Sequence, residues 1–154
     1  MRYVMDPDLS VGRGDLDDQH REIIRLLAEV QDRVDAGDSQ GAGQTLDALG
    51  NAVISHFVTE EALMEQWQYP ERTVHKGAHD LFIRDLLALV QEHADSGLSE
   101  EVVEWAQGRM PEWLTFHILT NDAPLGRYLA SRQRRPGAAT SPDAPAKPVK
   151  PVDS

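Results

Sequence analysis

Four stretches of helical hydrophobic periodicity, separated by three short breaks, constrain the fold more than any other feature of this sequence. Apolar residues recur at steps of three and four over residues 16–34, 46–67 and 75–89, and again after Ser99. The breaks are rich in residues that favour turns, and they fall at Gly37-Asp38-Ser39, Gln68-Tyr69-Pro70 and Asp95-Ser96-Gly97. Short connections make successive helices antiparallel. The sequence therefore predicts an all-α fold, an antiparallel up-down-up-down four-helix bundle.

Two features modify this prediction. Pro111 lies inside the fourth stretch, where it removes a backbone hydrogen-bond donor and crowds the preceding turn, so we expect a kink or break there. Beyond about Tyr128 the apolar pattern stops, and the remaining residues are rich in Pro, Ala and Ser. We therefore predict one domain over residues 1–131, which begins with an N-terminal arm, and a disordered tail over residues 132–154.

Charge and cysteine content limit the partners and ligands of this chain. The sequence has 26 Asp and Glu against 15 Lys and Arg, a formal net charge of -11, which repels a phosphate backbone. Without any cysteine, a metal ion must be bound by His, Asp or Glu. No leader pattern and no run of about 18 apolar residues is present. We expect a cytoplasmic protein with no nucleic-acid partner and no membrane span.

Five of the six histidines fall on the apolar faces of the predicted helices, and the stretch VISHFVTEEALM adds Glu60 to them. A single histidine in such a position is more often a hydrogen-bonded core residue than a ligand. A glutamate is almost never fully buried without a compensating charge, and Lys and Arg are missing from the stripe positions that would face it. A bound cation would supply that charge. The candidate ligands on the apolar faces are therefore His20, His56, Glu60, His75, His79 and His117.

Counting residues from the interhelix turns places these six side chains within roughly 9 Å of one another along the bundle axis. His93 lies about 21 Å from His79 on the same scale, so we predict that it is not a ligand. His56 and Glu60 are four residues apart, as are His75 and His79, so each pair shares one helix face. Imidazole suits Fe, Zn, Cu and Ni, and bridging carboxylates suggest a pair of ions. The pattern predicts a nitrogen-rich metal site.

Four motifs occur in order around these residues. They are LSVG followed by D-x-QH (Leu9 to Gly12, then Asp17 to His20), HFxxEExxM (His56 to Met64), YPxxxxHxxxH (Tyr69 to His79) and WLxxHIxxxD (Trp113 to Asp122). The set resembles the hemerythrin family, and more closely its single-domain bacterial members, the bacteriohemerythrins. The resemblance spans about residues 5–128. Met5 departs from it, since a tryptophan usually lies shortly before LSVG.

The resemblance implies a cofactor of two non-haem Fe ions with a bridging oxo or hydroxo group, and reversible binding of O2. It assigns His75, His79 and His117 to one iron, His20 and His56 to the other, and Glu60 and Asp122 as bridges. Asp122 follows His117 by five residues, roughly 140° around an ideal helix, whereas Asn121 at four residues shares the histidine's face more nearly. Spacing alone favours Asn121, and the resemblance implies Asp122.

Several apolar residues near the predicted ligands have two interpretations. They can be ordinary bundle core, and they can also form a dry O2 pocket that hinders loss of superoxide and entry of water. Leu114, three residues before a ligand, resembles a gating position in the family. The predicted pocket consists of Ile23, Phe57, Met64, Trp113, Leu114 and Ile118.

The functional prediction is O2 storage, delivery or sensing rather than enzymatic activity. The alternative is a di-iron enzyme with oxidase, peroxidase or nitric-oxide chemistry, or an iron-storage protein on the same bundle. Those bundles usually carry two E-x-x-H motifs, and this sequence has none. A structural zinc bundle is a third interpretation. The sequence leaves open the oligomeric state and whether an unidentified protein partner takes part.

Overall fold

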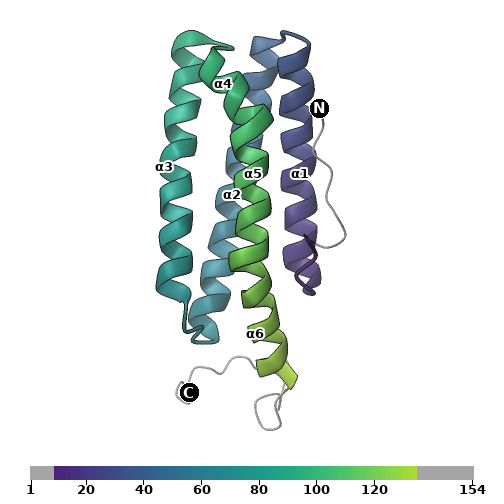
Figure 1. The fold of residues 1–154 in the computed structure, drawn as a ribbon, viewed down its shortest axis with the longest axis vertical. Coiled ribbons are helices and arrows are strands. Elements are labelled where there is room, and N and C mark those ends of the chain that lie inside the picture. Colours follow the sequence, from purple (N-terminus) through teal and green to yellow (C-terminus); the bar gives the residue numbers. More distant parts are fainter. Residues whose placement is uncertain (1–8, 135–154) are drawn as a thin grey trace.

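The computed structural model describes residues 9–134, and within this range it is a bundle of four helices without strands (Figure 1). Three helices are regular, and they are α1 (Gly14–Asp35), α2 (Ser39–Gln66) and α3 (Arg72–Ser96). The fourth is composite, because two π-helical turns interrupt it. It consists of α4 (Glu100–Glu104), η2 (Trp105–Arg109), α5 (Met110–His117), η3 (Ile118–Asp122) and α6 (Ala123–Arg134).

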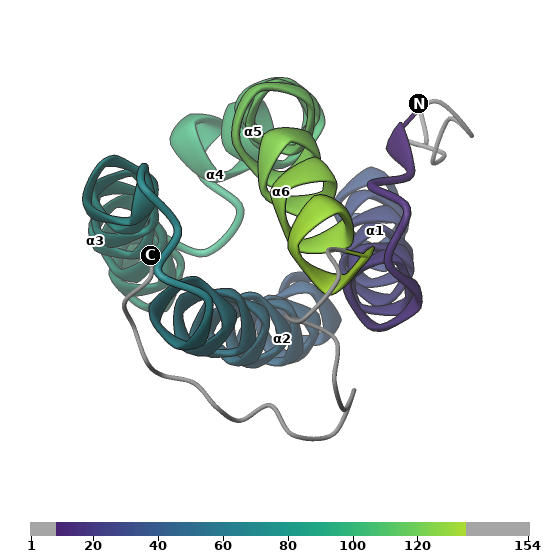
Figure 2. The ribbon, with the colours of Figure 1, turned by 90° about the horizontal axis from the view of Figure 1, so that it is seen from below.

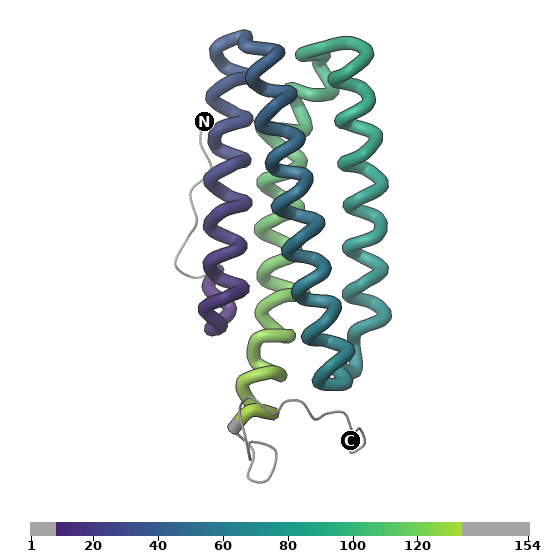
Figure 3. Tube along the Cα trace, turned by 180° about the vertical axis from the view of Figure 1, so that it is seen from behind, coloured from purple at the N-terminus to yellow at the C-terminus, as the bar shows by residue number. Residues whose placement is uncertain are grey.

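The helices run alternately up and down and surround a common interior (Figures 1 and 2). α1 and α2 lie side by side, and α3 lies on the other side of α2 from α1 (Figures 2 and 3). The predicted fold class is therefore confirmed. None of the helices within residues 9–134 is both long and apolar enough to cross a membrane.

The turns between helices lie at the predicted breaks and are formed by capping residues. Gly37 has a φ of 70° after α1, and Asp38 accepts a hydrogen bond of 2.9 Å from the backbone N–H of Gly41 at the start of α2. Gly97 has a φ of 67° after α3, and the Ser99 hydroxyl accepts from the N–H of Val102 at 3.3 Å. These local signals fix where each helix begins and ends.

The composite helix continues across Pro111 without a break. η2 ends just before the proline, and in this wide turn the N–H of Met110 donates to the Trp105 carbonyl five residues back. Pro111 has no N–H, so the Ala106 carbonyl receives its hydrogen bond from elsewhere: the side chain of Gln31, 1% exposed, donates to it at 3.0 Å. The sequence predicts a kink or a break at Pro111. The chain has no break there but a π turn, across which α4 is offset from α5 (Figure 2).

The apolar core is divided into two clusters along the bundle. The larger includes buried residues of the N-terminal arm, α1, α2, α3 and the composite helix, and its last buried residue on α2 is Phe57. The smaller contains Met64, Tyr69, Leu125 and Leu129 at the end of the bundle where α6 lies. The Tyr128 hydroxyl donates to the Trp67 carbonyl at 2.8 Å and joins α6 to the end of α2. On α2, Glu60 lies between Phe57 of the larger cluster and Met64 of the smaller one.

The described part of the N-terminal arm is packed against α1 and α6. Leu9 and Val11 are buried, and Asp17 accepts hydrogen bonds of 2.8 Å from the Ser10 hydroxyl and from the N–H of Val11. A Cβ at Gly126 would collide with the Val11 carbonyl oxygen, so the close approach of the arm to α6 requires glycine.

The remaining predictions about the ends fall largely outside the described residues. Residues 1–8, which include Met5, and residues 135–154 are not described. α6 extends to Arg134, so the first three residues of the predicted tail are helical. The domain boundary and the disorder of the rest of the tail stay predictions.

Candidate metal centre

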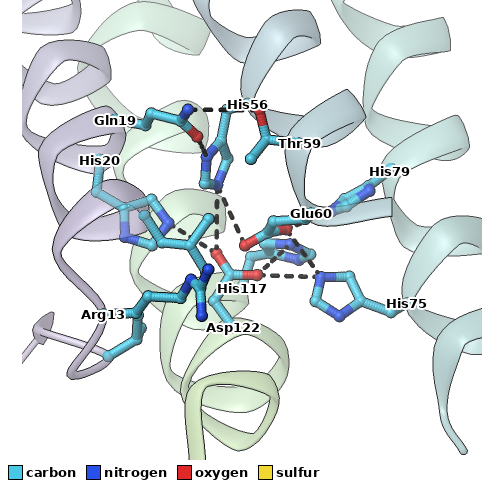
Figure 4. Close-up of polar contacts among 12 residues, drawn as sticks. Arg13, Gln19, His20, His56, Thr59, Glu60, His75, His79, His117 and Asp122 are labelled. Carbon is cyan, nitrogen blue, oxygen red and sulfur yellow. Dashed lines mark hydrogen bonds and ion pairs between the residues drawn. The ribbon is translucent and has the colours of Figure 1, made fainter. Parts of the chain in front are cut away.

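The seven residues predicted to bind metal come from all four helices and lie together inside the bundle (Figure 4). Each is at most 2% exposed. α1 provides His20, α2 provides His56 and Glu60, α3 provides His75 and His79, and the composite helix provides His117 and Asp122. His93 lies elsewhere, with its Nε2 3.0 Å from the Ser39 carbonyl oxygen, and it belongs to neither group of potential ligands within the described residues.

Glu60 contacts histidines on both sides of the centre. Its Oε1 lies 3.1 Å from the Nε2 atoms of His75 and His79. Its Oε2 lies 3.2 Å from Nε2 of His56. The carboxylate therefore spans two groups of histidines with different oxygen atoms.

Asp122, on the composite helix, also contacts both groups of histidines. Its Oδ1 lies 3.0 Å from Nε2 of His75 and 3.1 Å from Nε2 of His117. Its Oδ2 lies 2.9 Å from Nε2 of His20 and 3.9 Å from Nε2 of His56. Both carboxylates are thus shared between the two groups.

These contacts define two overlapping sets of potential ligand atoms, and within each set the atoms lie within 4.8 Å of one another. We name them by their histidines. The three-histidine half-site consists of His75, His79, His117, Glu60 and Asp122. The two-histidine half-site consists of His20, His56, Glu60 and Asp122.

The hydrogen bonding of these residues is incomplete in a way that fits metal ions. Several of their buried atoms have no partner with hydrogen-bond geometry within the described chain. Those nearest the other side chains of the centre are Nε2 of His56, His79 and His117, Oε2 of Glu60 and Oδ1 of Asp122, and the outer Nδ1 atoms of His20 and His75 also have none. An unsatisfied buried polar atom costs about 1–3 kcal/mol. Coordination of two ions by the inner atoms would satisfy those atoms, and the imidazole and carboxylate donors suit iron or zinc.

The electrostatics of the centre favour a cation. Burial acts to raise the pKa of Glu60, and so does the neighbouring Asp122, but the close contacts of its carboxylate with His56, His75 and His79 outweigh both and lower the pKa to about 2. Burial acts to lower the pKa of His56 and His75, but Asp122 and Glu60 raise each to about 9. The two buried carboxylates therefore attract positive charge, which a metal ion can supply in place of protons.

A π turn explains why Asp122, five residues after His117, faces the centre. In η3 the N–H of Ala123 donates to the Ile118 carbonyl five residues back, so this turn holds one residue more than an α-helical turn. Asp122 is 1% exposed, whereas Asn121 is half-buried with its Oδ1 2.9 Å from the Thr120 hydroxyl. The ideal-helix spacing that favoured Asn121 does not apply here.

Two further polar residues contact the histidines from outside, and the sequence analysis did not identify them. Nδ1 of His56 lies 2.7 Å from Oε1 of Gln19, and Nδ1 of His79 lies 2.9 Å from Oε2 of Glu61. Gln19 directly precedes His20 and Glu61 directly follows Glu60. Their positions inside the D-x-QH and HFxxEExxM motifs were the available signal.

The residues of the predicted O2 pocket do not all lie in one cluster. Ile23, Phe57, Leu114 and Ile118 are buried in the larger cluster, and half-buried Trp113 packs against it. Met64 belongs to the smaller cluster.

Two of these residues hold ligand rings directly. Phe57 stacks on His79 with centroids 3.7 Å apart and planes at 7°, and Trp113 stacks on His117 at 4.5 Å and 10°. The three-histidine half-site is therefore supported by aromatic rings.

Comparisons with known proteins agree with this geometry. Residues 11–129 match the family model of the hemerythrin HHE cation binding domain. Bacteriohemerythrin of Pseudomonas aeruginosa (strain LESB58) is 29% identical over 120 residues, which cover 78% of this chain and 76% of that protein. Bacteriohemerythrin of Aquifex aeolicus (strain VF5) is 29% identical over 119 residues, which cover 77% and 91%.

The fold is also found among solved structures. A crystal structure of a hemerythrin mutant superposes with a TM-score of 0.74 at 24% sequence identity, and covers 84% of this chain and 99% of that chain. Since the family model matches most of the chain, including all seven residues of the centre, the family predicted from the motifs is confirmed. This chain belongs to the hemerythrin family.

Proposed function

We propose that this chain is a non-haem di-iron protein that binds O2 reversibly. The observation that carries the proposal is the inequality of the half-sites, which offer five protein ligand atoms on one side and four on the other. A metal site that keeps a position open can take an external ligand, whereas a fully coordinated site is structural. Membership of the hemerythrin family supports iron as the metal and O2 as the ligand.

The protein residues around the centre hold the ligands and exclude water. Ile23, Leu114 and Ile118 are at most 4% exposed. An apolar surrounding disfavours departure of the ligand as the charged superoxide ion, because an unpaired ion is poorly stabilised there. These residues therefore favour release of neutral O2, which reversible binding requires.

The donor set also favours binding over oxidative catalysis. Five imidazoles and two carboxylates carry two formal negative charges, whereas di-iron carboxylate bundles use four glutamates. Less negative charge gives less stabilisation of highly oxidised iron. We therefore propose a role in O2 storage, delivery or sensing.

An optical titration tests this function. Protein loaded with iron and reduced without oxygen is titrated with O2, and we expect a visible charge-transfer band that disappears when O2 is removed under argon. Metal analysis of the same sample should give two iron ions per chain. Rapid irreversible oxidation without such a band would favour a di-iron enzyme, and one zinc ion per chain with no iron uptake would overturn the proposal.

The effect of replacing a glutamate of α2 by alanine needs a control away from the centre, and Glu65 provides it. Glu65→Ala removes an exposed glutamate of α2 whose nearest ion partner is Arg72, at 3.6 Å. This variant should titrate as the unchanged protein does.

A further inference from the structure

Two histidines of the centre have hydrogen-bond partners of different charge at their outer ring nitrogens. His79, in the three-histidine half-site, faces the carboxylate of Glu61 at 2.9 Å. His56, in the two-histidine half-site, faces the side-chain amide of Gln19 at 2.7 Å. The two half-sites therefore differ in their outer contacts as well as in their number of ligands.

Glu61 fixes the tautomer of His79 without help from a further hydrogen-bonding residue. A carboxylate only accepts hydrogen bonds, so Nδ1 of His79 must carry the hydrogen that it donates to Glu61. In the neutral imidazole the lone pair is then on Nε2, which points into the centre and lies 3.1 Å from Oε1 of Glu60. This is the tautomer that binds a metal ion through Nε2.

Gln19 needs a further residue to act on His56 in the same way, because an amide can present either its oxygen or its NH2 group. The Thr59 hydroxyl donates to the Ser55 carbonyl at 3.1 Å, so its oxygen is free to accept. It accepts from Nε2 of Gln19 at 3.4 Å, which directs Oε1 of Gln19 toward Nδ1 of His56.

The charge of the outer partner affects the strength of the ligand. A carboxylate that accepts from the outer nitrogen makes a histidine a stronger electron donor to its metal, and a neutral amide does so less. Within the described residues, the outer Nδ1 atoms of His20 and His75 have no hydrogen-bond partner. Among His20, His56, His75 and His79, therefore, only His79 has a charged outer partner and only His56 has a neutral one.

We propose that Glu61 and Gln19 are positioning residues that make the half-sites unequal in metal affinity. Glu61 strengthens metal binding at the three-histidine half-site, whereas Gln19 orients His56 but increases its electron donation to a metal ion less. The order of metal binding follows, with the three-histidine half-site filled first. The inference rests on the proposed function only for the identity of the native metal, because the hydrogen bonds act on any ion held by these nitrogens.

Titration of the metal-free protein with Zn²⁺ against a competing chelator tests the proposal. We expect two separable dissociation constants in the unchanged protein. Glu61→Gln, which keeps an acceptor of similar shape, should weaken the tighter site by about 10- to 100-fold and leave the weaker site nearly unchanged. Gln19→Glu should tighten the weaker site. Glu61→Asp keeps the charge and should recover part of the loss.

Glu65→Gln is the matched control, since it makes the same chemical change one turn along α2 at an exposed position. In the iron-loaded protein Glu61→Gln should also raise the midpoint potential, because a weaker donor stabilises the ferric state less. A purely steric role of Glu61 would leave both the Zn²⁺ constants and the potential unchanged in Glu61→Gln, and that result would overturn the proposal.

The test separates this inference from the proposed function. If the unchanged protein shows the two Zn²⁺ constants and the expected response to Glu61→Gln and Gln19→Glu, but iron loading gives no O2 band, the proposed function fails and the inference holds. If O2 binds reversibly but both substitutions affect the two sites equally, the inference fails and the function stands. Gln19→Glu and Glu61→Asp still decide the matter if Glu61→Gln does not fold.

Discussion

The two half-sites of the metal centre share two carboxylates but are built differently. In the three-histidine half-site, rings from α3 and the composite helix are stacked against Phe57 and Trp113. In the two-histidine half-site, His20 and His56 contact each other edge to face at 4.5 Å, and within the described chain neither has an aromatic ring stacked on it. The first half-site offers five potential ligand residues, two of them histidines with an aromatic ring stacked on them, and the second offers four. One level of the bundle thus combines two unequal sets of potential ligand atoms.

The largest expected effect comes from removing a carboxylate that both half-sites share. Glu60→Ala leaves the two-histidine half-site with three ligand atoms and the three-histidine half-site with four. We expect loss of the second iron and of O2 binding, measured as iron per chain and by optical titration. A Glu60→Ala protein with two irons and a normal O2 band would show that Glu60 is not a bridge.

Removing one histidine from each half-site in turn tests whether the half-sites differ in their number of ligand atoms. His56→Ala leaves three ligand atoms on its side, so we expect one tightly bound metal ion per chain. His79→Ala leaves four, the number that the other half-site has naturally, so we expect two ions with weakened binding. Metal analysis after dialysis against a weak chelator measures this difference. Equal stoichiometry in both variants would contradict the unequal half-sites.

The apolar wall of the centre should affect how long bound O2 survives. Leu114→Ala opens space beside the ligand-bearing turn, so we expect faster autoxidation, followed as the rate at which the O2-dependent band is lost. The cavity should also lower the free energy of unfolding by about 2–5 kcal/mol. Leu87→Ala, at a residue 58% exposed on α3, is the control. An unchanged autoxidation rate would remove Leu114 from the pocket.

The smallest effect should come from the aromatic support of the three-histidine half-site. Trp113→Leu removes the ring stacked on His117, a contact of about 0.5–1.5 kcal/mol, so metal binding there should weaken by about two- to tenfold. Phe116→Leu, at a residue 65% exposed on the same helix, is the control. Competition with a chelator measures both, and a loss confined to the two-histidine half-site would contradict the assignment.

Much of the fold could be predicted because its signals are local. The breaks at Gly37 and Gly97 follow from turn chemistry, and the burial of Glu60 among histidines follows from helical spacing and the absence of an opposing Lys or Arg. The response to Pro111 was not fully predictable, since the π turn is stabilised by Gln31 of another helix. A residue distant in sequence decided how the local defect is accommodated.

The predicted ligands also divide into those that local spacing identifies and those that tertiary contacts place. His20, His56, His75, His79 and His117 could be found by their positions on apolar faces, but Asp122 is placed by the wide turn η3, which an ideal helical repeat does not anticipate. Gln19 and Glu61 are polar neighbours of ligands, and only the packing of α1 and α3 against α2 brings them to the outer nitrogens of His56 and His79.

By itself, the sequence determined the four helices, their antiparallel order and the level at which the histidines and Glu60 meet, because these depend on spacing along the chain. The tertiary structure decided which carboxylate oxygen faces which histidine, how the ligands divide five to four, and which outer residues hold their rings. Those properties depend on the rotation and separation of neighbouring helices, which are set by contacts between residues far apart in the sequence.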